Sequence, residues 1–167
     1  FLKRKKADLY KPKLLYLGRY KKEKGIFSLT NILDSINFDF ELNIVGLKKK
    51  IISQNDKVKL FNEVNSTKKI ISFYDKCNIF VLPSYTEGSP KVIFESLARY
   101  RPIIVFEEIE HVKENLKGVF VCRRQTKDFI NKVHYIMKNY KYIIKEIKKN
   151  KINTKKQFQN KLNEIFQ

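Results

Sequence analysis

Six short apolar segments, separated by patterns typical of amphipathic helices, constrain the fold of this chain more than any other feature. They are predicted to be strands and cover residues 13–18, 40–46, 57–64, 78–82, 102–106 and 118–122. Between the first two, Ile26, Leu29, Leu33 and Ile36 recur at helical spacing. Short strands that alternate with helices indicate βαβ units. The sequence therefore predicts an α/β fold: a Rossmann-like, doubly wound parallel sheet of about six strands flanked by helices.

The length and composition favour one domain. The chain has 167 residues, of which 43% are hydrophobic, so it can bury a core, and no repeat or low-complexity stretch divides it. We assign residues 13–150 to the domain, residues 1–12 to a linker remnant and residues 151–167 to a C-terminal helix of the same domain. One continuous helix is predicted near the end of the domain. Its apolar face consists of Phe129, Val133, Ile136, Met137 and Tyr140.

Several features point to a cytoplasmic location. The chain begins with Phe1 and lacks the apolar segment of a signal peptide, so we expect a piece of a longer protein. No apolar run approaches the roughly 20 residues of a membrane span. Cys77 and Cys122 lie in apolar stretches without a Cys-x-x-Cys pair and are expected to be buried, reduced thiols.

The charge is strongly positive. Lysine and arginine number 36 against 17 acidic residues, which gives a net charge of +19. Since lysine is spread along the whole chain and far outnumbers arginine, we favour compositional bias and solvated helix faces over nucleic-acid binding. A peripheral contact with anionic lipid at the inner face of the membrane, through residues 141–156, is a secondary expectation. A continuous positive stripe would favour nucleic acid.

Cations follow the first predicted strand. Gly18 and Arg19 end it, and Lys24 and Gly25 precede the next helix. Two cations beside a helix start, where free N–H groups already favour an anion, suit a diphosphate. The spacing matches neither the dinucleotide fingerprint nor the Walker loop.

Two glutamates follow the strand at residues 78–82. Glu87 lies in the loop after Pro83-Ser84, and Glu95 lies inside the next predicted helix, which runs from about Pro90 to Arg99. A carboxylate on so apolar a helix needs a hydrogen-bonding partner, and ligand hydroxyls would serve. An ordinary exposed glutamate remains the alternative.

These residues, in this order, resemble the nucleotide-sugar-binding half of GT-B retaining glycosyltransferases of the GT4 type. The resemblance covers nearly the whole chain, and its most specific part is the block from Phe80 to Pro90 with Glu95-Ser96-Leu97-Ala98. It implies one half of a GT-B fold, whose other half is an N-terminal acceptor-binding domain.

The resemblance also implies a role for each site residue. Arg19 and Lys24, next to Gly18, would hold the donor diphosphate and stabilise the departing nucleotide. Glu87 would bind hydroxyls of the donor sugar, and Glu95 those of the ribose. The loop around the sugar would be shaped by Gly88, Ser89 and Pro90.

The implied reaction is transfer from a nucleotide-sugar, a UDP-sugar more than a GDP-sugar, to a glycan or lipid-linked acceptor in lipopolysaccharide or capsule synthesis. It would proceed with retention and without an essential metal or other cofactor. The sequence has no Asp-x-Asp motif, and Asp39-Phe40-Glu41 is interpreted as a loop end. The alternatives are a catalytically degenerate binding domain of this type and a basic nucleic-acid-binding α/β domain.

The chain departs from the family pattern at three places. Tyr100 replaces a usual glycine, Asn62 stands at a strand end where glycine is typical, and residues 107–110 replace a glycine-rich loop. His111 and His134 are interpreted as incidental.

Overall fold

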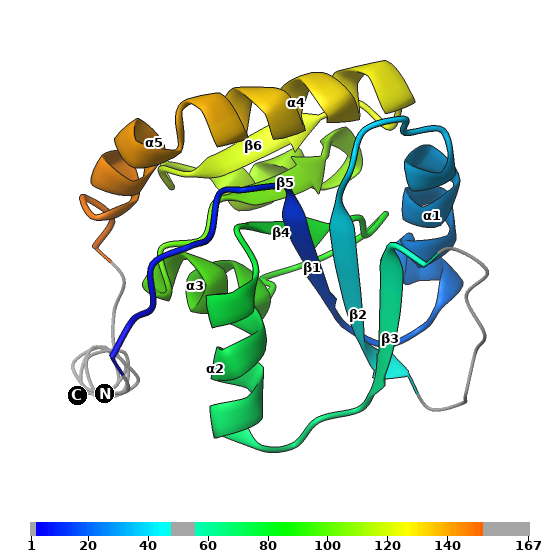
Figure 1. The fold of residues 1–167 in the computed structure, drawn as a ribbon, viewed down its shortest axis with the longest axis horizontal. Helices are drawn as coiled ribbons and strands as arrows, with labels where there is room; N and C mark the ends of the chain where they lie inside the picture. Colours follow the sequence, from blue (N-terminus) through cyan, green and yellow to red (C-terminus); the bar gives the residue numbers. More distant parts are fainter. Residues whose placement is uncertain (1–2, 48–55, 152–167) are drawn as a thin grey trace, which may run out of the picture.

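The structure, a computed structural model, describes residues 3–47 and 56–151. Six parallel strands form one sheet in the order β3-β2-β1-β4-β5-β6 (Figure 1). They are β1 (Lys13–Leu17), β2 (Glu41–Leu47), β3 (Val58–Asn62), β4 (Ile79–Leu82), β5 (Ile103–Phe106) and β6 (Val119–Cys122). All six lie at the positions that the apolar segments predict.

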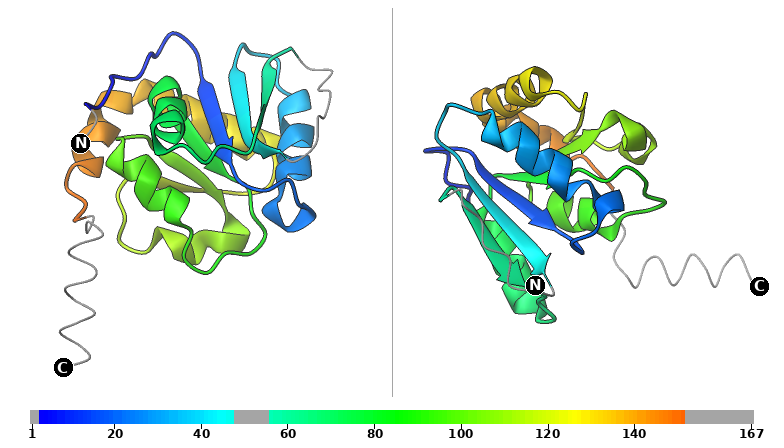
Figure 2. Two further views of the ribbon diagram at one scale, coloured as in Figure 1. Left: turned by 90° about the horizontal axis from the view of Figure 1, so that it is seen from below. Right: turned by 90° about the vertical axis from the view of Figure 1, so that its right-hand side faces the viewer.

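Helices cover both faces of the sheet. They are α1 (Ile26–Asp34), α2 (Thr67–Lys76), α3 (Lys91–Ala98), α4 (Thr126–Lys138) and α5 (Tyr140–Ile147), with two 3₁₀ helices, η1 (Lys22–Lys24) and η2 (Glu107–Lys113). α1 contacts α4 over one face, whereas α2 and α3 pack on the other (Figure 2). The predicted doubly wound α/β fold is therefore confirmed.

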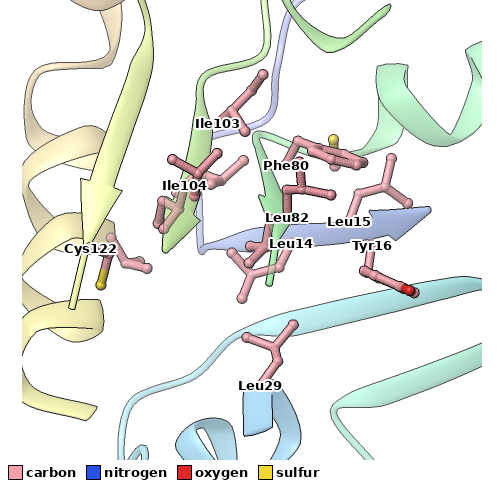
Figure 3. Packing of buried hydrophobic residues seen from close by; sticks show 14 of the residues in the cluster. Leu14, Leu15, Tyr16, Leu29, Phe80, Leu82, Ile103, Ile104 and Cys122 are labelled. Atoms are coloured by element: carbon pink, nitrogen blue, oxygen red, sulfur yellow. The ribbon is translucent and has the colours of Figure 1, made fainter. Parts of the chain in front are cut away.

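The core lies on both faces of the central strands. Leu14 of β1, Phe80 of β4 and Ile104 of β5 are at most 1% exposed, and Figure 3 shows them packed together. Every residue of β4 and β5 is buried, as expected for parallel strands covered on both sides. Cys77 and Cys122 are buried free thiols, as predicted, and burial raises the pKa of each to about 12.

The single helix predicted from Phe129 to Tyr140 is wrong in one respect. The helix breaks at Asn139 (φ −102°, ψ 16°), and Tyr140 begins a separate helix, α5. Asn139 donates from Nδ2 to the carbonyl oxygen of Tyr135 at 2.9 Å. This local bond competes with continuation of the helix. The predicted helix at residues 151–167 lies outside the described residues, except Lys151, which is not helical.

The segment that precedes β1 lies against the amino edge of the sheet. Asn78 is fully buried, and its amide Nδ2 donates to the carbonyl oxygens of Asp8 and Lys11. Lys11 also forms ion pairs with Asp39 and Glu41 at 3.2 and 3.1 Å, which agrees with a structural role for the Asp39-Phe40-Glu41 segment. In the described part of the chain, no helix combines the length and apolar character that crossing a bilayer requires.

Candidate functional site

The sheet order places the carboxyl ends of β1 and β4 side by side. These neighbouring strands lie where the strand order reverses, since β2 and β3 lie to one side and β5 and β6 to the other. Gly18 and Arg19 follow β1, and Glu87 lies in the loop after β4. Ligands of open α/β sheets bind at such a switch point. The fold thus brings candidate residues far apart in the sequence to one edge (Figure 1).

An ion pair joins the two sides of this edge. Lys24 Nζ lies 2.8 Å from Glu87 Oε1, and the two side chains are only 21% and 14% exposed. Ser84, which is fully buried, donates from Oγ to the same Glu87 oxygen at 2.7 Å. Among the described residues, none donates a hydrogen bond to Glu87 Oε2. One carboxylate oxygen of Glu87 is therefore held by the protein, and the other can accept a bond from a ligand.

Backbone contacts hold the loop that carries Glu87. The N–H of Tyr85 donates to the carbonyl oxygen of Glu23 in η1 at 3.0 Å. His111 of η2 lies with Nε2 2.9 Å from the Glu87 carbonyl oxygen, so the tautomer protonated at Nε2 donates to it. His111 is thus a contact of the loop that carries Glu87, while its interpretation as incidental to the chemistry stays a prediction. No local sequence signal identifies it, because its partner comes from another element.

Arg19 and Gly18 lie beside a buried phenol. Tyr16 is 1% exposed, and its hydroxyl donates to the Arg19 carbonyl oxygen at 2.8 Å. Burial raises the pKa of Tyr16 well above its usual value, the charges of Glu87 and Glu23 raise it further, and Arg19 opposes them. A Cβ at Gly18 would lie 2.7 Å from the Tyr16 hydroxyl, which explains the glycine there.

Glu95 belongs to a second cluster on α3. Its side chain is exposed, and Oε2 accepts a hydrogen bond of 3.0 Å from the hydroxyl of Tyr74 on α2. Tyr74 is itself buried, and its pKa is raised mainly by burial and then by Glu95. In the described residues, no hydrogen bond or ion pair links Glu95 to the Lys24–Glu87 pair. The structure thus orients Glu95 through a tyrosine that sequence reasoning did not single out.

The loop between the two glutamates is open to solvent. Gly88 and Ser89 are exposed, and no atom lies within 4 Å of a Cβ built on Gly88. Pro90 is the N-cap residue of α3. The loop is therefore open to solvent at Gly88.

Arg124 is the residue at this edge that sequence reasoning missed. It follows β6, and its Nη1 donates to Ser28 Oγ at 2.7 Å and to the Pro83 carbonyl oxygen at 3.0 Å. Nε and Nη2 bind the two carboxylate oxygens of Glu108 at 2.7 and 2.9 Å. The guanidinium also lies 4.0 Å from the ring centre of Tyr85. Arg124 thus ties α1, η2 and the start of the loop with Glu87 together.

The pair with Arg124 holds the pKa of Glu108 below its usual 4.5. A carboxyl group whose pKa is lowered by folding stabilises the fold above its unfolded pKa. This contribution is lost as the pH falls through the lowered value in the folded state.

Comparison with known protein families identifies the family of this chain. The family described as "Glycosyl transferases group 1" matches residues 11–139, more than half of the chain. The chain belongs to this family. The relatives and the solved structures agree with the assignment.

Two curated relatives are similar over part of their length. The chain is 33% identical over 92 residues to the putative teichuronic acid biosynthesis glycosyltransferase TuaC of Bacillus subtilis, a match that covers 54% of this chain and 23% of that protein. It is 28% identical over 138 residues to the capsular polysaccharide biosynthesis glycosyltransferase CapM of Staphylococcus aureus, which covers 73% and 36%. The chain therefore spans only about a quarter to a third of the length of these relatives.

Two solved structures share the fold. Sucrose-phosphate synthase from Thermosynechococcus elongatus superposes with a TM-score of 0.69 at 20% identity, over 85% of this chain and 40% of that one. Anabaena Alr3699/HepE in complex with UDP-glucose superposes with a TM-score of 0.66 at 14% identity, over 83% and 43%. These likenesses show that the predicted Rossmann-like fold is shared with part of each of these larger chains.

The structure shows how this domain accommodates the three places where its sequence departs from the family pattern. Tyr100 keeps the left-handed backbone (φ 58°) that favours glycine, and its ring lies 4.3 Å from the Arg4 guanidinium. The segment that replaces the glycine-rich loop forms η2, in which Glu108 is neutralised by Arg124. Asn62 simply ends β3 with an exposed side chain.

Proposed function

We propose that this domain binds the nucleotide-sugar donor of a glycosyltransferase that builds a surface polysaccharide. The observation that carries the proposal is the Lys24–Glu87 ion pair at the switch point of the sheet. It places a cation and a carboxylate with one free oxygen where ligands of such sheets bind. A UDP-sugar is favoured as donor, and the complex of Anabaena Alr3699/HepE with UDP-glucose supports this choice.

The proposed roles follow from the contacts. The ammonium of Lys24 carries three protons, of which one points to Glu87, so two remain for the donor diphosphate. The Arg19 guanidinium is exposed and forms no hydrogen bond within the described residues. Fixed cations of this kind stabilise the negative charge that develops on a leaving diphosphate. These cations support activation of the donor without an essential metal. Retention, and transfer to a glycan or lipid-linked acceptor held by an N-terminal domain, belong to the same proposal through the family resemblance.

Glu87 and Glu95 are proposed to divide the rest of the donor. The free Oε2 of Glu87 would accept a bond from a sugar hydroxyl, and the exposed carboxylate of Glu95 would accept bonds from the ribose. Glu95 keeps one oxygen free while Tyr74 holds the other. The contact with an anionic membrane that the sequence suggests concerns another face of the domain and does not bear on donor binding.

We expect UDP to bind the chain and raise its melting temperature by several degrees at saturating concentration, because a ligand that binds only the folded state stabilises it. Glu95→Ala should weaken UDP about tenfold through loss of a charge-assisted hydrogen bond. Glu87→Ala should leave UDP affinity nearly unchanged and reduce sugar transfer by the whole enzyme. Thermal-shift titration with UDP, GDP and ADP measures the binding.

Glu63→Ala is the matched control, since Glu63 is exposed and lies after β3. It should not change UDP affinity. Equal loss in Glu87→Ala and Glu95→Ala would contradict the division of roles. Absence of a shift with all three nucleotides, in protein shown to be folded, would instead favour a degenerate binding domain.

Tyr74→Phe is expected to weaken UDP about threefold, because Glu95 loses the hydrogen bond that orients it. Stability should change by less than about 1 kcal/mol, since the exposed Glu95 carboxylate regains water. Titration calorimetry with the double variant Tyr74→Phe/Glu95→Ala tests the mechanism. The double variant should bind UDP no more weakly than Glu95→Ala alone, and additive losses would refute a role through Glu95.

A further inference from the structure

A basic groove of about 610 Å³ lies at the amino edge of the sheet, away from the donor site. The segment before β1 forms one wall and α5 the other, and Figure 1 shows the two side by side. Tyr100 and Arg101, which precede β5, complete the lining. Its other basic residues are Arg4, Lys5, Lys6, Lys141, Lys145 and Lys148.

The lysines of this groove are not neutralised by ion pairs within the described residues. None of its five lysines forms an ion pair with an acidic side chain in the part of the chain that the structure describes. The neighbouring acids pair with other cations: Asp75 lies 2.7 Å from Arg99 and 4.0 Å from Arg101, and Glu146 pairs with Lys149. Like charges held this close together repel, so an anionic partner would stabilise the arrangement.

The aromatic residues of the groove do not suit nucleic acid. The Tyr100 ring is contacted by the Arg4 guanidinium at 4.3 Å and the Lys148 ammonium at 5.6 Å, so bases cannot stack freely on it. Tyr140 is 5% exposed, and its hydroxyl donates to the Asn78 carbonyl oxygen. Proteins that bind single strands expose such rings for stacking.

The composition of the groove suits a lipid surface instead. Lysine predominates over arginine, and the long lysine stems lie beside apolar side chains, including Leu9 at 38% exposed and Ile144. Cations above a partly exposed apolar floor are typical of surfaces that lie on anionic headgroups. We propose that this groove docks the domain on anionic phospholipid. The donor site lies at the opposite edge of the sheet and stays open to solution.

Vesicle sedimentation tests the docking. The chain is expected to bind vesicles of equal parts phosphatidylcholine and phosphatidylglycerol, and not vesicles of phosphatidylcholine alone. The triple variant Lys141→Gln/Lys145→Gln/Lys148→Gln should bind the anionic vesicles about a hundredfold more weakly, because each lysine near a charged membrane contributes on the order of one kcal/mol. UDP should not change the binding, so failure of donor binding leaves this result intact.

The matched control removes the same charge from the other edge. Lys91, Lys113 and Lys127 are exposed and lie in elements that follow the carboxyl ends of strands. Their triple glutamine variant should keep most of the binding. An equal loss in both triple variants would show attraction by overall charge and overturn the proposal. Tighter binding of a single-stranded oligonucleotide through Lys141, Lys145 and Lys148 would also overturn it.

A fluorescent probe supplies a second readout. The chain has no tryptophan, so Leu9→Trp places a single indole at the groove. Its emission should shift to the blue with the anionic vesicles and not with the neutral ones. Tyr135→Trp, on the half-exposed outer side of α4, should not shift. Equal shifts at both positions, or none at Leu9→Trp, would overturn docking through this groove.

Discussion

Replacing Gly25 with alanine is expected to lower the free energy of unfolding by about 3–5 kcal/mol. Gly25 lies between η1 and α1 in the left-handed region (φ 66°), and a Cβ there would lie 1.8 Å from the carbonyl oxygen of Pro83. The Pro83 oxygen belongs to the main chain, and the main chain also fixes the position of the added Cβ. Rotation of a side chain therefore cannot relieve the contact. The collision would separate the turn with Lys24 from the loop with Glu87. Urea denaturation of the chain measures the loss.

Gly88→Ala is the control for this prediction. Gly88 lies in the same loop region, but its backbone has no positive φ and nothing lies within 4 Å of an added Cβ. The change should therefore alter stability by less than about 1 kcal/mol. Equal effects of the two substitutions would contradict the close contact of Gly25 with Pro83. UDP affinity should fall with Gly25→Ala and not with Gly88→Ala.

Arg124→Ala is expected to destabilise the domain by about 2–4 kcal/mol. The substitution removes both hydrogen bonds to Glu108 and leaves the Pro83 carbonyl oxygen without this donor. It also empties the space between the rings of Tyr85 and Phe106, whose centres lie 4.0 and 4.3 Å from the guanidinium carbon. The side chain is 14% exposed, so water can replace only part of these contacts. Chemical denaturation at neutral pH measures the change.

Two further variants separate geometry from charge. Arg124→Lys keeps the charge but cannot bind Glu108 and Pro83 together, so it should recover less than half of the loss. Arg123→Ala removes the same charge from the neighbouring exposed position, which forms no side-chain ion pair within the described residues, and should change stability little. If Arg124→Lys were as stable as the unchanged chain, the guanidinium geometry would be irrelevant.

The strands could be predicted because their signal is local. In β4, four consecutive apolar residues are followed by Pro83. This pattern predicts a buried parallel strand without any knowledge of the strands beside it. The break between α4 and α5 could not be predicted in the same way. The apolar spacing continues from Ile136 to Tyr140 across Asn139, so periodicity alone indicates one helix. The side-chain bond of Asn139 to the preceding turn decides otherwise.

The residues of the candidate site also fall into a group that local sequence patterns identify and a group that they do not. Arg19, Lys24, Glu87 and Glu95 stand at recognisable positions after strands or inside a motif, so the sequence identified them. Their partners are different. Tyr74 lies in a helix and Arg124 in a loop without a motif. Their contacts come from α3 in one case, and from α1, η2 and the loop after β4 in the other.

The sequence by itself determined the α/β class, the number of strands and the family, since apolar periodicity and short motifs depend only on neighbours along the chain. Only the tertiary structure decided that Lys24 pairs with Glu87, that Tyr74 orients Glu95 and that basic residues from two distant segments line one groove. These contacts join residues widely separated in the sequence. They form because the strand order reverses between β1 and β4, and because α5 returns to the edge where the chain enters the sheet.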